Sequence, residues 1–469
     1  MLAIHGGTPV RPECHASAHP DATRPAPWCP GHASDVTCPA APDPRPAAPD
    51  ATHRCPRYSF AMLQPQTPNP QLRAARAANS VAFALQGFFL AVILTELPQQ
   101  KKEFGLSDGL IVAMVAVISL LAGGGSVTAE RIALRWSSRT ALRIGLGLIA
   151  ATGVAIAFAP NTIVLFGALA VYGIAVGIVD AGTNMQAVFI QHGYGRFVLS
   201  SFYAAWSAGS IVGALFVAAA ERIDLPLWAS ILIPAGVVLG LGQVFAPRLL
   251  GREEAEAGTT EAAIAQAAPG TSVPTRLFLV FGVVIALAFA IDLAVGNWSA
   301  LYLTDELLSS SSMAALALAA YQGASLVGRL TGDLWVRRYG PRAVVRVAAV
   351  VGVIGLAIVV GAPGPVPAIL GFLIAGIGLP IIAPLCFSEA GQLTSGSDLD
   401  ALIARLNLFN YAGTLVGGAV VGVLSDAVNM RAGFAIPLVF AVILIGFARV
   451  FHPRATTSAA DVRAATEPA

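Results

Sequence analysis

The sequence predicts an all-α integral membrane protein with twelve transmembrane helices, arranged as two repeats of six. Three observations support this prediction: the composition, the spacing of the apolar runs and an internal repeat. Of the 469 residues, 56% are hydrophobic and 12% are charged, and the mean hydropathy is +0.72. Soluble domains carry about 25% charged residues, so a chain of this composition is expected to be surrounded by lipid.

The apolar runs recur roughly every thirty to forty residues, and many have about the twenty residues that cross a bilayer core. The predicted helices lie near 78–97, 107–128, 140–159, 163–190, 200–220, 226–246, 275–297, 312–334, 342–361, 366–389, 400–424 and 431–451. The polar segment 247–274 is predicted to link two six-helix halves, 74–246 and 275–451, and residues 452–469 form a tail.

Residues 1–73 form a Pro-rich leader without the apolar core of a signal peptide or a membrane span. We predict that the leader is disordered and that Met62 is the true start of the protein. The leader holds four of the five cysteines, and none has the C-x-x-C spacing of a metal site. A metal-binding tail built from its histidines is the alternative, but no histidine spacing repeats. No metal or cofactor is therefore expected.

Basic residues are concentrated in every second loop between the predicted helices. These loops and the tail hold Arg131, Arg135, Arg139, Arg143, Arg196, Arg248, Arg252, Arg276, Arg337, Arg338, Arg342, Arg346, Arg405, Arg449 and Arg454. The opposite loops hold only Lys101, Lys102, Arg222 and Arg431. By the positive-inside rule, both termini and the linker are predicted to lie on the cytoplasmic side of the inner membrane. The near balance of 28 basic and 26 acidic residues gives no reason to expect nucleic acid as a partner.

The two halves share an internal sequence repeat. A shift of 203 positions places Ala129–Arg143 over Gly332–Arg346, so that an acid is followed by the same series of arginines twice. A shift of 204 positions places Ser207–Ala214 over Tyr411–Gly418 and matches two Gly-x-x-x-Gly pairs, which let helices pack closely. Repeated halves of six helices are typical of transporters that rock about a central site.

The segment GRLTGDLWVRRYGPR (Gly328–Arg342) resembles the loop signature G-x-x-x-D-R/K-x-G-R-R/K of the major facilitator superfamily. The first-half copy departs from it, with Glu130 for the Asp and Ser137 for the Gly. Runs similar to the fucose-permease-like branch are DAGTNMQ (Asp180–Gln186), GRFVLSSFYAAWSAGSIVGA (Gly195–Ala214), NWSALYL (Asn297–Leu303) and GLPIIAPLCFSEAG (Gly378–Gly391). The resemblance covers about residues 74–451. It implies a solute carrier with a central cavity between the halves, usually driven by a proton gradient. Where this branch often has His in the fifth helix, this sequence has Tyr203.

The acids and arginines of the repeated loop predict a conformational latch. Glu130 and Asp333 end the second and eighth helices, where a carboxylate can pair with arginines and a neighbouring helix terminus in one state only. The predicted latch residues are Glu130, Arg131, Arg135, Arg139, Arg329, Asp333, Arg338 and Arg342. The alternative is that the arginines only orient the protein. Arg329 and Asp333 are also spaced for a local ion pair on one helix face.

Three of the carboxylates within predicted spans are candidate functional groups, because ionisable groups are costly there and therefore tend to be functional. Asp180 lies in mid-helix with Asn184 one turn on and Gln186 nearby, so we predict that they face the cavity and bind solute or proton. Asp292 lies late in the seventh helix, near its extracellular end, and Glu389 follows two prolines in the tenth. The alternatives are helix–helix hydrogen bonding at Asp180, a solvated helix end at Asp292 and a place at the cytoplasmic rim for Glu389.

Aromatic and amide side chains complete the candidate solute site. Such groups suit sugars or other polar organic solutes through stacking and hydrogen bonding, and the alternative is ordinary packing within the bundle. The candidates are Tyr203, Asn297, Trp298, Asn407 and Asn410.

These features predict a secondary active transporter that moves a small, sugar-like organic solute by alternating access, is coupled to protons and works as a monomer. The alternatives are a drug or metabolite efflux antiporter and a non-transporting receptor on a carrier scaffold. The Gly-rich run 209–214 lacks the Gly-Pro that is frequent in drug-exporting antiporters, which favours import. An enzyme is not expected, because no H-E-x-x-H, P-loop or nucleophile-elbow motif stands in a suitable context.

Overall fold

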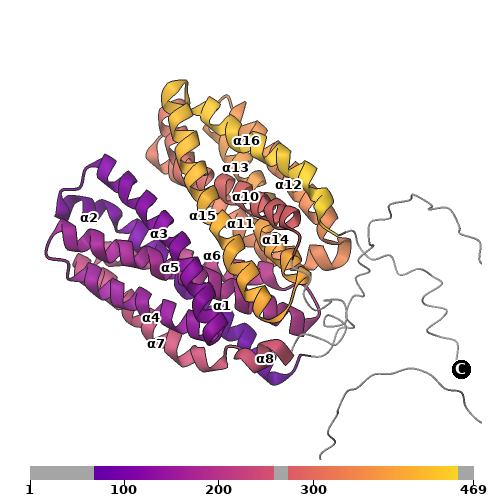
Figure 1. Cartoon of the computed structure of the whole chain (residues 1–469). Coiled ribbons are helices and arrows are strands. Elements are labelled where there is room, and N and C mark those ends of the chain that lie inside the picture. Colours follow the sequence, from indigo (N-terminus) through magenta and orange to yellow (C-terminus); the bar gives the residue numbers. More distant parts are fainter. Residues whose placement is uncertain (1–67, 258–272, 453–469) are drawn as a thin grey trace, which may run out of the picture. The chain divides into compact units, whose positions relative to one another are not determined.

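The computed structural model describes residues 68–257 and 273–452 of the chain (Figure 1). Met62 with the rest of residues 1–67, most of the predicted linker and the tail after residue 452 lie outside the described residues. The described part consists of helices and the turns between them, and contains no strand. The first half is drawn from indigo to pink and the second from red to yellow (Figure 1).

The first half comprises α1 (Pro70–Thr95), α2 (Leu97–Phe104), α3 (Asp108–Arg135), α4 (Ser138–Ala157), α5 (Thr162–Tyr194), α6 (Leu199–Arg222), α7 (Leu227–Phe245), a 3-10 turn (Ala246–Arg248) and α8 (Arg252–Ala257). The second half comprises α10 (Thr275–Leu301) with a π-helical extension (Tyr302–Glu306), α11 (Ser311–Tyr339), α12 (Pro341–Val360), α13 (Pro365–Gly378), α14 (Ile382–Ala390), α15 (Gly396–Ala427) and α16 (Met430–Phe447). Short 3-10 turns join α13 to α14 (Leu379–Ile381) and follow α14 (Gly391–Leu393) and α16 (Ala448–Val450).

The prediction of twelve spans in an all-α membrane protein is confirmed. The spans are α1, α3 to α7, α10 to α12, the continuous segment of α13 and α14, α15 and α16. Eleven helices of the described residues are long and apolar enough to cross a membrane, and α11 is the remaining span. α11 has 29 residues but is more polar, because it carries Arg329, Asp333, Arg337 and Arg338. The chain is therefore a multi-pass membrane protein. Two short helices, α2 and α8, were not predicted.

Polar side chains fix where several helices begin. Asn69 precedes α1, and its Oδ1 accepts a hydrogen bond from the Leu72 backbone N–H at 2.7 Å. Pro70 stands in the first turn, where a missing N–H is tolerated. α1 therefore starts eight residues before the predicted position near 78. Similar side-chain caps precede α3, α4, α5, α11 and α16, from Ser107, Ser137, Asn161, Ser310 and Asn429.

The repeated Gly-x-x-x-Gly pairs bring equivalent helices into close contact in both halves. A Cβ added to Gly209 of α6 would lie 2.0 Å from the Ala84 carbonyl oxygen of α1. A Cβ added to Gly413 of α15 would lie 2.1 Å from the Ala286 carbonyl oxygen of α10. The absence of side chains at these positions lets the backbones touch, as the repeat predicts.

The two halves meet mainly through two helix pairs, α3 with α15 and α6 with α11. These pairs are equivalent under the sequence repeat. α3 and α11 end, and α6 and α15 begin, at the same end of the bundle, and we call it the arginine-rich end after its loops.

Candidate functional site

A polar cluster lies where the halves meet at mid-depth. Asp180 of α5 accepts hydrogen bonds from the Gln86 side chain of α1 and from the Tyr411 hydroxyl of α15. Because Tyr411 belongs to the second half, the Asp180 carboxylate joins the two halves. Among the described residues no basic side chain forms an ion pair with Asp180. A proton can therefore neutralise this carboxylate without breaking an ion pair.

Asn184 and Tyr203 extend the polar cluster. Asn184 lies one turn from Asp180, and its Nδ2 donates to the Asp180 carbonyl oxygen at 2.9 Å. The Tyr203 hydroxyl of α6 donates to Asn184 Oδ1 at 3.0 Å, and both side chains are buried. Asp180, Asn184 and Tyr203 thus lie together, and their solute or proton role remains a prediction.

Arg329 belongs to this region and not to the predicted latch. Its Nη1 donates to Ser207 Oγ of α6 at 2.7 Å, and its Nε donates to the Pro380 carbonyl oxygen at 3.4 Å. The predicted local pair with Asp333 is absent among the described contacts, because the guanidinium turns inward to α6. Arg329 is 5% exposed, so a charged group lies in the interior of the bundle.

Asp292 of α10 supplies the nearest opposite charge to Arg329. Its Oδ2 lies 3.6 Å from Arg329 Nη2, and its Oδ1 accepts a hydrogen bond from the Tyr321 hydroxyl at 2.8 Å. The rings of Tyr203 and Trp206 lie 5.8 and 6.0 Å from the guanidinium carbon. Asp292 therefore belongs to the polar cluster. The alternative prediction was a solvated helix end without such partners.

The α3–α15 pair has a neutral residue at the position equivalent to Arg329. Asn407 of α15 donates from Nδ2 to Ser126 Oγ of α3 at 2.9 Å. Ser126 stands at the repeat position of Arg329, so only one of these two equivalent positions is charged. Asn410 lies one turn from Asn407 and is hydrogen bonded within its own helix, to Thr414.

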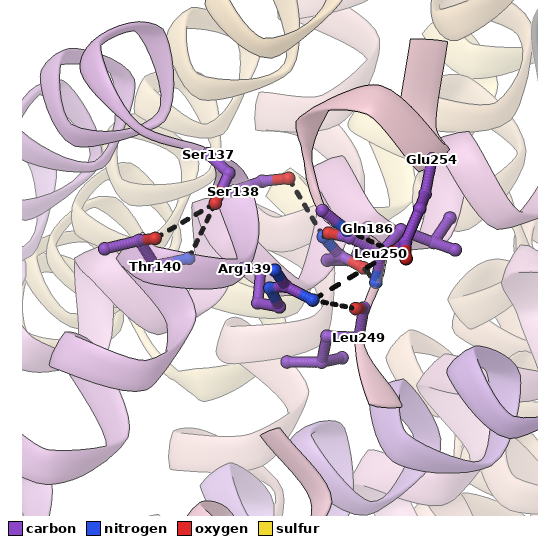
Figure 2. Close-up of polar contacts among 9 residues, drawn as sticks. Ser137, Ser138, Arg139, Thr140, Gln186, Leu249, Leu250 and Glu254 are labelled. Atoms are coloured by element: carbon purple, nitrogen blue, oxygen red, sulfur yellow. Dashed lines mark hydrogen bonds and ion pairs between the residues drawn. The ribbon is translucent and has the colours of Figure 1, made fainter. Parts of the chain in front are cut away.

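Gln186 makes its hydrogen bonds outside the polar cluster, in contrast to the prediction. Its Nε2 donates to Ser138 Oγ at 3.0 Å and to the Leu250 carbonyl oxygen at 2.8 Å, and its Oε1 accepts from the Leu250 N–H at 3.0 Å (Figure 2). Two residues of helix turn a side chain by about 200°, so Gln186 cannot share the face of Asn184. It holds the chain that leaves α7.

Glu389 stands at the repeat position of Gln186 and has the equivalent partner. Its Oε2 accepts from the His452 backbone N–H at 3.1 Å and lies 2.7 Å from the His452 Nδ1. Its Oε1 accepts from Gln392 at 3.2 Å. Glu389 therefore lies at the arginine-rich end, which was the alternative reading, and holds the chain that leaves α16.

Arg139 and Arg342 also bind the segments that follow α7 and α16. Arg139 donates to the Leu249 carbonyl oxygen at 3.3 Å, beside Glu254 at 4.0 Å (Figure 2). Arg342 donates to the Phe451 carbonyl oxygen at 2.8 Å. These two predicted latch residues thus contact the segments after α7 and α16 of their own halves, and not the acids Glu130 and Asp333.

Asn297 and Trp298 do not join the polar cluster. Asn297 is exposed, and the Trp298 indole donates to the Gly418 carbonyl oxygen of α15 at 3.3 Å. Trp298 therefore packs within its own half.

At the arginine-rich end, Asp333 of α11 caps the first turn of α6 in the other half. Its two carboxylate oxygens accept from the backbone N–H groups of Ser200 and Ser201, both at 3.0 Å. Arg337 donates to the Phe197 carbonyl oxygen just before α6, at 2.9 and 3.2 Å. A carboxylate at a helix N-terminus is favoured by the free N–H groups and by the helix dipole.

Glu130 makes the equivalent contact between α3 and α15. Its Oε1 accepts from Arg405 Nη2 at 2.8 Å and from Nε at 3.1 Å. Arg405 stands at the repeat position of Ser201, so the two acids contact matching points of the opposite half. Arg131, Arg135 and Arg338 are exposed and make no hydrogen bond or ion pair with either acid among the described residues.

Five residues that make these contacts were not predicted from the sequence: Gln86, Ser207, Tyr321, Arg337 and Arg405. Only Arg405 carried a usable signal, because the 204-residue shift places it over Ser201 at the start of α6. The partners of the other four lie in other segments, between 29 and 140 positions away in the sequence.

These features define a class of protein: a membrane bundle of two six-helix repeats that meet at a polar centre and at paired contacts near one end. The Major Facilitator Superfamily model matches residues 39–214 and 279–468. The chain therefore belongs to the major facilitator superfamily, and it is a transport protein and not an enzyme.

Known proteins agree with this assignment. An uncharacterized transporter, y4wD, of Sinorhizobium fredii (strain NBRC 101917 / NGR234) is 30% identical over 79% of this chain and 96% of its own length. The structure of the transporter FucP in the outward conformation has a TM-score of 0.67 at 18% identity, over 81% of this chain and 99% of FucP. The proton:xylose symporter XylE, bound to 6-bromo-6-deoxy-D-glucose, has a TM-score of 0.61 at 16% identity, over 82% of this chain and 96% of XylE.

Proposed function

We propose that the protein is a secondary transporter of a small polar organic solute, coupled to protons, with Asp180 as the proton-carrying group. The observation that carries this proposal is the bond between Asp180 of the first half and the Tyr411 hydroxyl of the second. A proton on Asp180 weakens it as an acceptor, so proton binding alters a contact between the halves. This contact gives protons a means to shift the equilibrium between two arrangements of the bundle.

The neighbouring side chains suit a polar, sugar-like solute. Asn184 and Asn410 offer amides, and Tyr203 and Trp206 offer aromatic faces beside Arg329. The fold similarity to the proton:xylose symporter XylE supports proton coupling. We further propose that the protein works as a monomer in the inner membrane, with the arginine-rich end in the cytoplasm.

Two contacts form the proposed latch that closes the arginine-rich end. Asp333 with the first turn of α6 is one, and Glu130 with Arg405 is the other. Both join the halves, so both must separate when the bundle opens at that end.

Solute uptake into vesicles tests the proposal. A ligand is first found by thermal stabilisation of the purified protein, and its accumulation is then measured after a pH jump. We expect accumulation by wild type, whereas Asp180→Asn retains ligand binding and exchange but loses accumulation driven by the gradient. Glu389→Gln is the matched control, because this buried carboxylate bonds to His452 outside the polar cluster. Gradient-driven accumulation by Asp180→Asn at the wild-type level would remove Asp180 from the proposal.

A further inference from the structure

We propose that the solute is an organic anion and that Arg329 binds its carboxylate. This inference rests on the proposed function, because it names the class of solute for the same site. Arg329 is 5% exposed and lies between the halves. A positive charge at bilayer depth is costly even when it is paired, so a buried arginine there tends to be functional.

The protein contacts satisfy the Arg329 guanidinium only in part. The group has five N–H donors, and the described residues accept two hydrogen bonds, from Ser207 Oγ at 2.7 Å and the Pro380 carbonyl at 3.4 Å. Asp292 Oδ2 lies 3.6 Å from Nη2. An N–H···O bond is about 2.7 to 3.2 Å long, so Asp292 balances the charge without a hydrogen bond. A solute carboxylate can use the remaining donors in the two-point geometry that arginine favours.

The Asp292 side chain gives access to the charge pair. Arg329 is 5% exposed, whereas the Asp292 side chain beside it is 28% exposed. Tyr321 holds Asp292 through Oδ1, which keeps this carboxylate in place beside the guanidinium when a second anion arrives. The rings of Tyr203 and Trp206 flank the guanidinium and offer apolar faces to the carbon skeleton of a solute.

Charge balance links this binding to the proton site. Without solute, Arg329, Asp292 and a charged Asp180 together carry one net negative charge. A solute carboxylate adds one negative charge, and a proton on Asp180 removes one, so the loaded site carries the same net charge. One proton therefore accompanies one carboxylate, and the combined movement of solute and proton is electrically neutral.

Matched solute pairs test the inference on the purified full-length protein. The pairs are D-gluconate with D-glucitol, D-glucuronate with D-glucose, and nicotinate with nicotinamide, and thermal stabilisation is measured for each. We expect stabilisation by a carboxylate and none by its neutral partner. Arg329→Lys should bind the carboxylate at least about tenfold more weakly, because lysine lacks the two-point geometry.

A double variant keeps the test independent of folding. Arg329→Gln leaves Asp292 unpaired, whereas Arg329→Gln with Asp292→Asn removes both charges and leaves no buried ion alone. We expect this pair of substitutions to abolish the carboxylate response in a folded protein. Equal stabilisation of wild type by a neutral partner, or a carboxylate response that survives the double variant, would overturn the inference.

Uptake into vesicles separates this inference from the proposed function. Gradient-driven accumulation of a neutral solute, unchanged in the double variant, would reject the anion site and retain the proton-coupled transporter. A carboxylate that binds through Arg329 but does not accumulate under a pH gradient would reject proton coupling and retain the anion site.

Discussion

Carboxylates inside this bundle differ by what surrounds them. Asp180 is bonded to neutral donors from both halves, Asp292 faces Arg329, and Glu389 is bonded to the chain that leaves α16. Of these three, Asp180 and Asp292 belong to the polar cluster and Glu389 does not. Carboxylates of one chain therefore stand in three different environments, and contacts with other helices decide which environment each one has.

Glu96, between α1 and α2, should give stability a pH dependence. It is 1% exposed, and burial raises the pKa of its carboxyl, Ser230 partly lowers it and the charge of Glu221 raises it further. A carboxyl with a raised pKa stabilises the fold at low pH, and this contribution is lost as pH rises through the folded-state pKa. Glu96→Gln should therefore raise the melting temperature by about 1 to 3 °C at neutral pH and leave it unchanged in acid.

Thermal melts of both proteins from acidic to neutral pH check this prediction. Glu103→Gln is the matched control, because Glu103 is exposed on α2, and its melting temperature should follow wild type. A gain for Glu96→Gln that is equally large in acid would contradict the titration of Glu96.

Candidate residues could be picked out where the signal lay in the sequence pattern itself. Asp180 stands out as an acid in an apolar run, and the spacing to Asn184 fixes their common face. Arg329 was assigned to the latch because its sequence neighbours form the loop signature. Its partner Ser207 lies 122 positions away, so only the packing of α11 on α6 could bring them together.

Among the elements, the end of α11 contacts the start of α6. The repeated loop predicted that Asp333 pairs with nearby arginines and with a neighbouring helix terminus, but it did not predict which arginine contacts that terminus. Arg337 bonds to the Phe197 carbonyl, whereas the predicted Arg338 is exposed and lies over the Tyr339 ring. Arg337→Glu should therefore reduce uptake severalfold, because it repels the neighbouring Asp333. Arg338→Glu, the matched control, should transport at nearly the wild-type rate with both proteins inserted equally. Equal loss in the two variants would assign the effect to loop charge alone.

The glycine contacts between α6 and α1 should be intolerant of side chains. Gly209→Val places a Cβ 2.0 Å from the Ala84 carbonyl oxygen and forces the helices apart, which should destabilise the protein by about 1 to 3 kcal/mol or more. Gly236→Val on α7 is the control, because nothing lies within 4 Å of the added Cβ. Melting temperatures of the two variants in one detergent provide the comparison, and equal values would contradict close packing as the role of Gly209.

At the scale of the whole molecule, hydrogen bonds join the two halves at the arginine-rich end of the described residues. The inter-half hydrogen bonds of Asp333, Arg337, Glu130, Asn407 and Asp180 all lie between that end and mid-depth. The helix count and the repeat could be predicted from hydropathy and from self-similarity along the chain. The state of closure could not, because it depends on which of two sets of contacts between the halves is formed.

If the halves rock about the centre, holding α3 against α15 should stop transport. Ser126 Oγ and Asn407 Nδ2 are 2.9 Å apart across the halves, so cysteines at both positions can be joined by a short bis-methanethiosulfonate, which forms a reducible disulfide with each, in a background without native cysteines. We expect cross-linking to reduce uptake to background and a reducing agent to restore it. The matched pair Ser138 and Gln186, 3.0 Å apart within the first half, should be joined without loss of uptake. Full uptake by the cross-linked inter-half pair would mean that α3 and α15 do not separate during transport.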